Sequence, residues 1–207
     1  MKIATLVVGP IEENCYIVFD GASKEAIIID PGAEADVIIE CIRDNGLHPQ
    51  MIVNTHGHND HVGAVAAIKQ AFHIPFCMHS DDEEWLHAPL SEMLQLHGGD
   101  GLVIDIPLTD RKVVRGAATA FTVIHTPGHT RGGCVLFFQN EKVAFTGDTL
   151  FKGTVGRTDF PGGSFDAICD SVRNKLAVLP DDCILYPGHG PKSTMGFERA
   201  HNPYVRG

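Results

Sequence analysis

Apolar residues in the first part of the chain gather in short runs that are rich in β-branched side chains. Glycine and proline separate these runs, which is typical of strands joined by turns. The runs predict three strands, at Ile3–Val8, Cys15–Phe19 and Ala26–Asp30. Over Ala33–Asn45 the apolar spacing changes to three and four residues, which predicts a helix that stops at Gly46.

The middle of the chain continues to alternate strand and helix patterns. Met51–Asn54 is a short apolar run that predicts a buried strand, and Val62–Phe72 has helical spacing. Ile74–Met78 predicts another strand, followed by a short helix at Asp81–His87. Ala88–Leu108 shows no clear period, and long segments of this kind are often functional, so we expect a loop that borders the site.

The second half of the chain repeats this kind of pattern. Five apolar runs predict strands, at Lys112–Val114, Thr119–Thr126, Cys134–Phe138, Lys142–Thr146 and Cys183–Tyr186. Ser164 is a good N-cap for a helix that reaches Leu179, with Pro180 beyond its end. A short helix is predicted at Thr194–His201.

The order of predicted elements is the same in the two halves. Each half has two strands, a helix and a further strand, and then a loop that contains histidine. Two such ββαβ halves facing each other place two sheets in the middle and helices outside, which is an α/β fold. Because no linker-like or low-complexity stretch separates the halves, we expect one domain over residues 1–207.

Composition narrows the class of protein. The chain has 207 residues, 43% of them hydrophobic, which predicts a soluble globular protein. Its net charge of −10 disfavours nucleic acid and membrane surfaces as partners. Six scattered cysteines without a C-x-x-C pair fit buried thiols in a reducing compartment. The chain shows neither a charged leader nor a long apolar run, so we expect a cytoplasmic location.

Candidate chemistry concentrates after the predicted Met51–Asn54 strand. Thr55–His61 reads T-H-G-H-N-D-H, so three imidazoles and a carboxylate lie within six residues. Neutral imidazoles and carboxylates are ligands that borderline divalent metals prefer. Continued strand geometry would point His56 and His58 the same way, whereas the turn into the helix carries Asp60 and His61 to a second position. One loop can therefore serve two adjacent metals.

Three later loops supply further candidate ligands. His129, Asp148 and His189 each follow a predicted strand and lie beside glycine, which lets the backbone turn sharply. Asp148 is the natural bridge, because each of its two oxygens can bind one metal. The predicted ligands are His56, His58, His129 and Asp148 for the first metal, and Asp60, His61, His189 and Asp148 for the second.

A site of this kind favours hydrolysis. Two metals roughly 3.5–4 Å apart can hold a water between them, and metal binding lowers the pKa of that water to about 7. Hydroxide is then available at neutral pH, and no protein nucleophile is required. We assign Asp60 and Asp148 as the catalytic residues, since their charges and the hydroxide nearly balance two divalent ions. Zinc is our first choice of metal, and iron and manganese are alternatives.

The combined motifs resemble those of the metallo-β-lactamase superfamily. The resemblance rests on Thr55–His61, Pro127-Gly128-His129-Thr130, Gly147-Asp148-Thr149 and Pro187-Gly188-His189-Gly190. It implies a four-layer αβ/βα sandwich over almost the whole chain. A closer resemblance, to the short bacterial glyoxalase II-like hydroxyacylglutathione hydrolases, rests on Gly147–Phe151, Gly156–Phe160 and His201–Tyr204. It implies a metal-dependent thioesterase that cleaves S-D-lactoylglutathione or a related glutathione-derived small-molecule thioester by a metal-bridging hydroxide.

Two departures from that family concern the substrate. The longer glyoxalase II enzymes have an extra C-terminal helical region that helps to hold glutathione. The sequence runs to Gly207 without a match to that region, so we expect this protein to lack it. A basic residue that contacts glutathione in the family matches Arg157, but the aromatic residue expected two positions later is Asp159. Arg157 is therefore a candidate substrate-binding residue, and an ion pair between Arg157 and Asp159 is the alternative.

Two other functions are compatible with the motifs. Persulfide dioxygenases also resemble this chain, but they use a single iron held by two histidines and one aspartate, here His56, His129 and Asp148. The chain could instead be a metal-stabilised binding module without turnover. The complete ligand set disfavours this last alternative, because structural zinc sites are closed and usually rich in cysteine.

Overall fold

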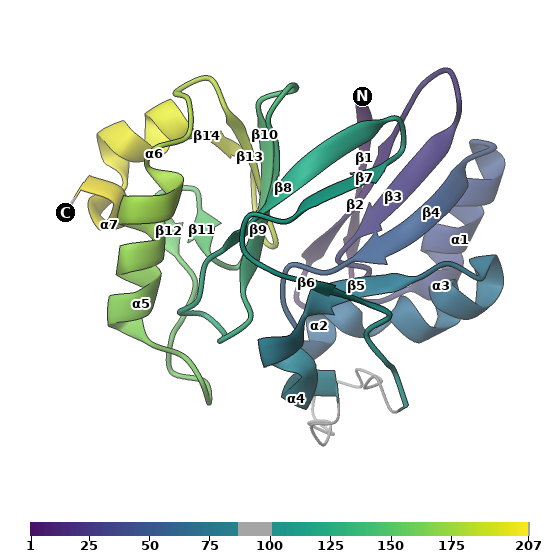
Figure 1. Cartoon of the computed structure of the whole chain (residues 1–207), viewed down its shortest axis with the longest axis horizontal. Helices are drawn as coiled ribbons and strands as arrows, with labels where there is room; N and C mark the ends of the chain where they lie inside the picture. Colours follow the sequence, from purple (N-terminus) through teal and green to yellow (C-terminus); the bar gives the residue numbers. More distant parts are fainter. Residues whose placement is uncertain (87–100, 207) are drawn as a thin grey trace.

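Two six-stranded sheets pack against each other, and helices cover the outer face of each sheet (Figure 1). The computed structural model describes residues 1–86 and 101–206. Its layers run in the order helix, sheet, sheet, helix, so the predicted αβ/βα sandwich is confirmed. Most of the loop expected at Ala88–Leu108 lies outside the described residues, and the end of that segment forms a strand.

The N-terminal half of the chain builds the first sheet, in the strand order β1-β2-β3-β4-β5-β6. Its strands are β1 (Lys2–Val8), β2 (Glu13–Phe19), β3 (Glu25–Ile29), β4 (His48–Val53), β5 (Phe76–His79) and β6 (Ile106–Leu108). The first three strands are antiparallel neighbours, and β3 to β6 run parallel. The carboxyl ends of β3 to β6 therefore lie at one edge of the sheet.

The C-terminal half builds the second sheet, in the order β14-β13-β10-β9-β8-β7. Its strands are β7 (Val113–Gly116), β8 (Thr119–His125), β9 (Cys134–Phe138), β10 (Val143–Gly147), β13 (Ile184–Pro187) and β14 (Ser193–Thr194). A separate two-stranded sheet contains β11 (Leu150–Phe151) and β12 (Thr154–Val155). β9 and β10 are antiparallel and β10 and β13 parallel, as β2, β3 and β4 are in the first half. The predicted repeat of two ββαβ halves is therefore present.

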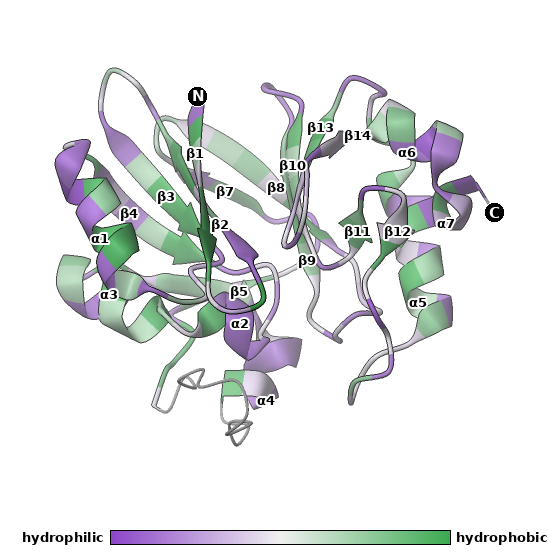
Figure 2. Ribbon diagram, turned by 180° about the vertical axis from the view of Figure 1, so that it is seen from behind, coloured by the Kyte–Doolittle hydropathy of each residue, from purple (hydrophilic) through white to green (hydrophobic). Residues whose placement is uncertain are grey.

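Helices form the two outer layers, as Figure 2 shows from behind. The first sheet is covered by α1 (Ala35–Asp44) and α3 (Val65–Phe72), and the second by α5 (Phe165–Asp170), the π-helical segment η3 (Ser171–Leu176), α6 (Met195–His201) and α7 (Pro203–Arg206). Three short segments, α2 (Asn59–Val62), η1 (Ser80–Asp82) and α4 (Glu83–Leu86), follow strands of the first sheet. Among the described residues, none of these helices has the length and apolar character needed to span a bilayer.

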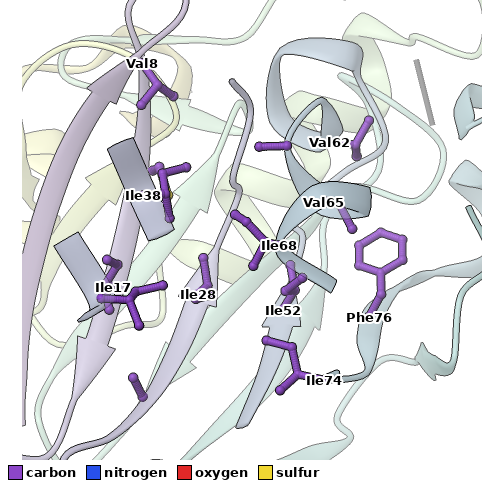
Figure 3. Close-up of a cluster of buried hydrophobic side chains, with 14 of the residues drawn as sticks. Val8, Ile17, Ile28, Ile38, Ile52, Val62, Val65, Ile68, Ile74 and Phe76 are labelled. Atoms are coloured by element: carbon purple, nitrogen blue, oxygen red, sulfur yellow. The ribbon is translucent and has the colours of Figure 1, made fainter. Parts of the chain in front are cut away.

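Amphipathic helices explain the outer layers. Ile38 of α1 and Ile68 of α3 point toward Ile28 and Ile52 of the first sheet, and all four side chains are fully buried (Figure 3). Burial of such a side chain contributes about 1.5–3 kcal/mol relative to exposure. A second apolar layer joins the facing surfaces of the two sheets, and a third lies under the C-terminal helices. The second layer therefore fixes the two sheets relative to each other.

The helix predicted at Val62–Phe72 is wrong in its boundaries. The structure has two helices, α2 and α3, separated at Gly63 and Ala64. A Cβ atom on Gly63 would lie 2.3 Å from the carbonyl oxygen of Gly32, so the chain segments cross too closely for any side chain. The amide of Ala64 donates to the carbonyl of Pro31 instead of continuing a helix. The apolar spacing hides this crossing, because it continues through the break.

Candidate metal centre

Loops from both sheets meet at one edge of the sandwich. The loop Thr55–His61 follows β4, and His129 follows β8 in the facing sheet. Asp148 comes directly after β10 and His189 after β13. Because β4, β10 and β13 end at this edge, the structure brings all seven predicted metal-binding side chains into one region.

Three histidines and one carboxylate oxygen form a first group of donors. Nδ1 of His58 lies 3.1 Å from Nε2 of His56 and 2.9 Å from Nε2 of His129. Oδ2 of Asp148 lies 3.5 Å from Nε2 of His129. Four donors that bind one zinc ion at about 2.0–2.1 Å are separated from each other by about 3.3 Å. These three separations are close to the spacing expected of donors that share a single ion.

A second group lies on the other side of Asp148. Nε2 of His61 lies 3.5 Å from Oδ2 of Asp60 and 3.5 Å from Oδ1 of Asp148. Nε2 of His189 lies 3.1 Å from Oδ2 of Asp60. Oδ1 of Asp148 thus faces His61, whereas Oδ2 faces His129 and lies 3.8 Å from Nε2 of His189, so this carboxylate is shared by both groups.

Hydrogen bonds set the ring tautomers of two histidines in the first loop. The hydroxyl of Thr55 donates to Oδ2 of Asp30 at 2.6 Å, so its oxygen can accept from Nδ1 of His56 at 3.1 Å. Nδ1 of His61 lies 3.1 Å from the same Asp30 oxygen and donates to it. Both rings therefore carry their proton on Nδ1 and present a lone pair on Nε2. Asp30 therefore holds the start of the loop and the ring of His61.

Backbone carbonyls set the tautomers of the two later histidines. Nδ1 of His129 donates to the carbonyl of Arg157 at 2.7 Å, and Nδ1 of His189 donates to the carbonyl of Ile11 at 3.2 Å. A carbonyl only accepts, so both rings again present the Nε2 lone pair to the centre. Nothing in the sequence signals that Arg157 and Ile11 act through their backbone.

The residues fit a metal pair. Nε2 of His61 and Oδ1 of Asp148 are buried, lie 3.5 Å apart, and have no hydrogen-bond partner among the residues that the structure describes. A buried lone pair and a buried carboxylate oxygen facing each other are costly unless a cation lies between them. Gly188 allows this approach, since a Cβ atom there would lie 2.2 Å from Oδ1 of Asp148.

Electrostatics differ between the two groups of donors. Burial, together with neighbouring histidines, lowers the pKa of His56 and brings the pKa of His58 to about 3, so both rings are neutral at pH 7. Burial also lowers the pKa of His61 and His189, but the carboxylates Asp60 and Asp148 outweigh it and raise the net pKa of both. Without a metal, His61 and His189 therefore take up protons before His56 and His58 do.

Aromatic side chains lie beside the first group. The ring of His58 is 4.5 Å from the ring of Trp85 and 5.0 Å from that of Phe160. The guanidinium of Arg157 lies over Phe160 at 4.2 Å and makes two hydrogen bonds of 2.7 Å to Asp159. The alternative expected for Arg157, an ion pair with Asp159, is therefore present in the structure.

Two functional neighbours have no sequence signal. The side chain of Asn14 donates to the carbonyls of Pro187 and Gly190, on either side of His189. The buried Asp82 accepts hydrogen bonds from the loops that carry His58 and His129. Neither residue belongs to a recognisable motif. Each forms hydrogen bonds to residues that are far away in the sequence and that become neighbours only in the folded protein.

Comparison with known proteins identifies the class. The family model described as metallo-beta-lactamase superfamily matches residues 8–189, so the chain belongs to this superfamily. A hydroxyacylglutathione hydrolase, GloC, of Haemophilus influenzae is 38% identical over 99% of this chain and 98% of its own length. The crystal structure of the BLEG-1 B3 metallo-beta-lactamase has a TM-score of 0.93 at 36% identity and covers all of both chains. TTHA1623 in a di-iron-bound form has a TM-score of 0.86 at 34% identity, covering 97% of this chain and 99% of that one.

Proposed function

We propose that the chain is a metal-dependent hydrolase that cleaves S-D-lactoylglutathione or a related acyl-glutathione thioester. The observation that carries this proposal is the pair of donor groups that share the two oxygens of Asp148. The full-length similarity to a protein named hydroxyacylglutathione hydrolase supports the choice of thioester.

The proposed ligands divide between two ions. The first ion is held by His56, His58, His129 and Asp148, and the second by Asp60, His61, His189 and Asp148. Zinc is the first choice, and iron is the main alternative, because a similar protein has been crystallised in a di-iron-bound form. When bound, two such ions supply an activated water at neutral pH and polarise the thioester carbonyl.

The chain's own residues prepare this centre. Burial would raise the pKa of Asp60 and Asp148, but the nearby histidines outweigh it and hold both pKa values below the usual range. Both carboxylates are therefore ionised and offset the positive charge of the ions. The Nδ1 hydrogen bonds of His56, His61, His129 and His189 hold four rings in the orientation that directs Nε2 inward.

Arg157 is the proposed contact for a substrate carboxylate. Its side chain is 60% exposed and stacks on Phe160, whose ring adjoins His58. A carboxylate of glutathione could bind the guanidinium by sharing it with Asp159 or by displacing Asp159. Arg157 therefore lies close enough to the centre to bind the thiol part of a substrate whose acyl group reaches the metals.

The test measures metal content and two activities on the same preparation. Protein purified without chelators is analysed for zinc, iron and manganese, and is assayed for S-D-lactoylglutathione hydrolysis and for oxygen uptake on glutathione persulfide. We expect about two metals per chain together with thioester turnover. About one iron per chain with oxygen uptake and little thioester turnover would instead support the dioxygenase function. Two metals with neither activity would contradict the proposed substrate.

A further inference from the structure

We propose that Asp82 is a positioning residue for the first metal. It holds together the two loops, one from each half of the fold, that carry the histidine ligands of this metal, and it thereby affects the affinity for the first metal and not for the second. The proposal rests on the two-metal centre of the proposed function. Asp82 is the last residue of η1, directly after β5, and its side chain is fully buried. It is not one of the predicted metal ligands.

The carboxylate of Asp82 bonds to three donors on two loops. Oδ2 accepts from the amide of Gly57 at 3.0 Å and from the hydroxyl of Thr130 at 2.7 Å. Oδ1 accepts from the amide of Gly132 at 2.6 Å. Gly57 lies between His56 and His58, and Thr130 follows His129. One side chain is thus bonded next to all three histidines of the first donor group.

Packing around Asp82 leaves little freedom in these loops. A Cβ atom on Gly57 would lie 2.8 Å from the carbonyl oxygen of Asp82 and 2.9 Å from Cβ of Trp85. A Cβ atom on Gly132 would lie 2.7 Å from Cγ of Asp82. The two loops therefore rest directly on η1 and α4, from which the Trp85 ring also contacts His58.

A carboxylate is the appropriate group for this position. An ionised carboxylate only accepts hydrogen bonds and has about four lone-pair sites, so it satisfies three converging donors without presenting a donor of its own. Burying a charge is costly, and an apolar side chain would suffice if only volume had to be filled. The geometry therefore indicates that Asp82 fixes the position of the two loops rather than filling space.

The second donor group has a different fixing residue. Asn14 of β2 donates from its side-chain nitrogen to the carbonyls of Pro187 and Gly190, at 3.1 and 3.0 Å. These bonds hold the loop that carries His189, which comes from the other half of the chain. Asn14 thus provides a matched variant, because its loss should weaken the second metal rather than the first.

The main test uses Asp82→Asn, which keeps the size of the side chain. The side-chain NH₂ of the asparagine must then face the backbone N–H of either Gly132 or Gly57. One of the two loops therefore loses its hydrogen-bond acceptor and faces a donor instead. Metal-free protein is titrated with Zn²⁺ against a chromophoric chelator. NMR spectra of ¹⁵N-histidine-labelled protein show which Zn²⁺ ion binds less tightly, because each ion shifts the ring signals of its own histidine ligands. Folding is checked by circular dichroism.

We expect Asp82→Asn to lower the affinity for the ion that shifts the His58 and His129 signals by about 10–100-fold, and to leave the other ion within about threefold. Asn14→Ala should show the reverse pattern. Equal losses at both ions, or unchanged affinities in the folded variant, would overturn the proposal. If Asp82→Asn does not fold, the same measurement is made on Thr130→Val, which removes only one of the three hydrogen bonds to Asp82. An unchanged first affinity in Thr130→Val would then be the overturning result.

The outcome is independent of the proposed reaction. Zn²⁺ affinities are measured without substrate, so an absence of thioester hydrolysis in the wild-type protein would refute the substrate and leave the role of Asp82 unaffected. Conversely, normal thioester hydrolysis with unchanged affinities in both Asp82→Asn and Thr130→Val would refute only the role of Asp82.

Discussion

Nδ1 of His61 lies 3.1 Å from Oδ2 of Asp30, and both side chains are buried. Asp30 also accepts the amide of Thr55 at 2.7 Å and the hydroxyl of Thr55 at 2.6 Å. A residue at the end of β3 therefore fixes both the start of the histidine-rich loop and the ring of its last histidine.

Replacing Asp30 should weaken the second metal. In Asp30→Asn the amide keeps the volume but offers a single acceptor oxygen. Its NH₂ group therefore meets either the Thr55 amide or both the Thr55 hydroxyl and Nδ1 of His61, so the bonds that position His61 are weakened. We expect the affinity for one Zn²⁺ to fall by about 10–100-fold. The unfolding free energy should fall by about 1–3 kcal/mol, because a buried donor loses its partner. Chelator competition and urea unfolding measure the two effects, and an unchanged Zn²⁺ affinity would contradict the role of Asp30.

Replacing Asp148 should affect both metals together. Asp148→Ala removes the oxygens that face His61 and His129, so neither donor group keeps its carboxylate bridge. We expect metal content to fall from about two per chain to below one, and thioester turnover to fall at least about 100-fold. Elemental analysis and initial rates test this result. Glu40→Ala, at an exposed position on α1, is the control. A variant of Asp148 that keeps both metals and full turnover would disprove the bridge.

Acidification should release the two metals in order. The pKa values of His61 and His189 are raised, so protons begin to compete with the second metal for these ligands at a higher pH than they do at His56 and His58. The lowered pKa values of His56 and His58 leave these two ligands of the first metal unprotonated until the pH is much lower. Metal content measured after dialysis from about pH 8 to about pH 5 should therefore fall in two steps. Release of both metals in one step would contradict this order.

Arg157→Ala tests the proposed substrate contact. If the guanidinium binds a substrate carboxylate, KM for S-D-lactoylglutathione should rise by roughly tenfold with kcat changed less than about twofold. An acyl thioester of N-acetylcysteamine, which has no carboxylate, should be hydrolysed as before. Asp159→Asn, which frees the guanidinium, should lower KM. An unchanged KM in Arg157→Ala would mean that the pair with Asp159 serves only the loop.

The turn between β7 and β8 should be stabilised by glycine. Ala117 and Ala118 have φ angles of 52° and 56°, a left-handed conformation that costs a residue with a Cβ atom roughly 1–2 kcal/mol. Ala118 is exposed, so Ala118→Gly removes this cost without leaving a cavity, and we expect a net gain of about 0.5–1 kcal/mol. Ala120→Gly, in β8, should instead destabilise by about 0.5–1 kcal/mol. Urea unfolding of the two variants tests the difference.

The sequence predicts the features that depend on local patterns. Strand and helix periodicities place most elements within a few residues, and the repeated ββαβ order predicts the two facing sheets. The loops that carry His56, His129 and His189 each follow a strand, so the sequence also predicts that they meet. These features depend only on residues that are close together in the sequence or on the general rules of sheet packing.

Features that depend on contacts between distant segments are not visible in the sequence. Asp82 lies in a run of four acidic residues at the start of the short helix predicted at Asp81–His87, yet its side chain is fully buried between two loops. The carbonyl of Arg157 orients His129, and any residue type could supply that carbonyl. The break at Gly63 likewise depends on the crossing with Gly32. In each case the tertiary partner, rather than the local pattern, determines the role.

Each proposed ion takes ligands from both halves of the chain. The N-terminal half supplies His56, His58, Asp60 and His61, and the C-terminal half supplies His129, Asp148 and His189. A chain cut between β6 and β7 would yield two fragments, neither of which could enclose an ion alone. Reassembly of the fragments would then depend on the free metal concentration, so the ions would act as a linker between two subunits as well as a centre for catalysis.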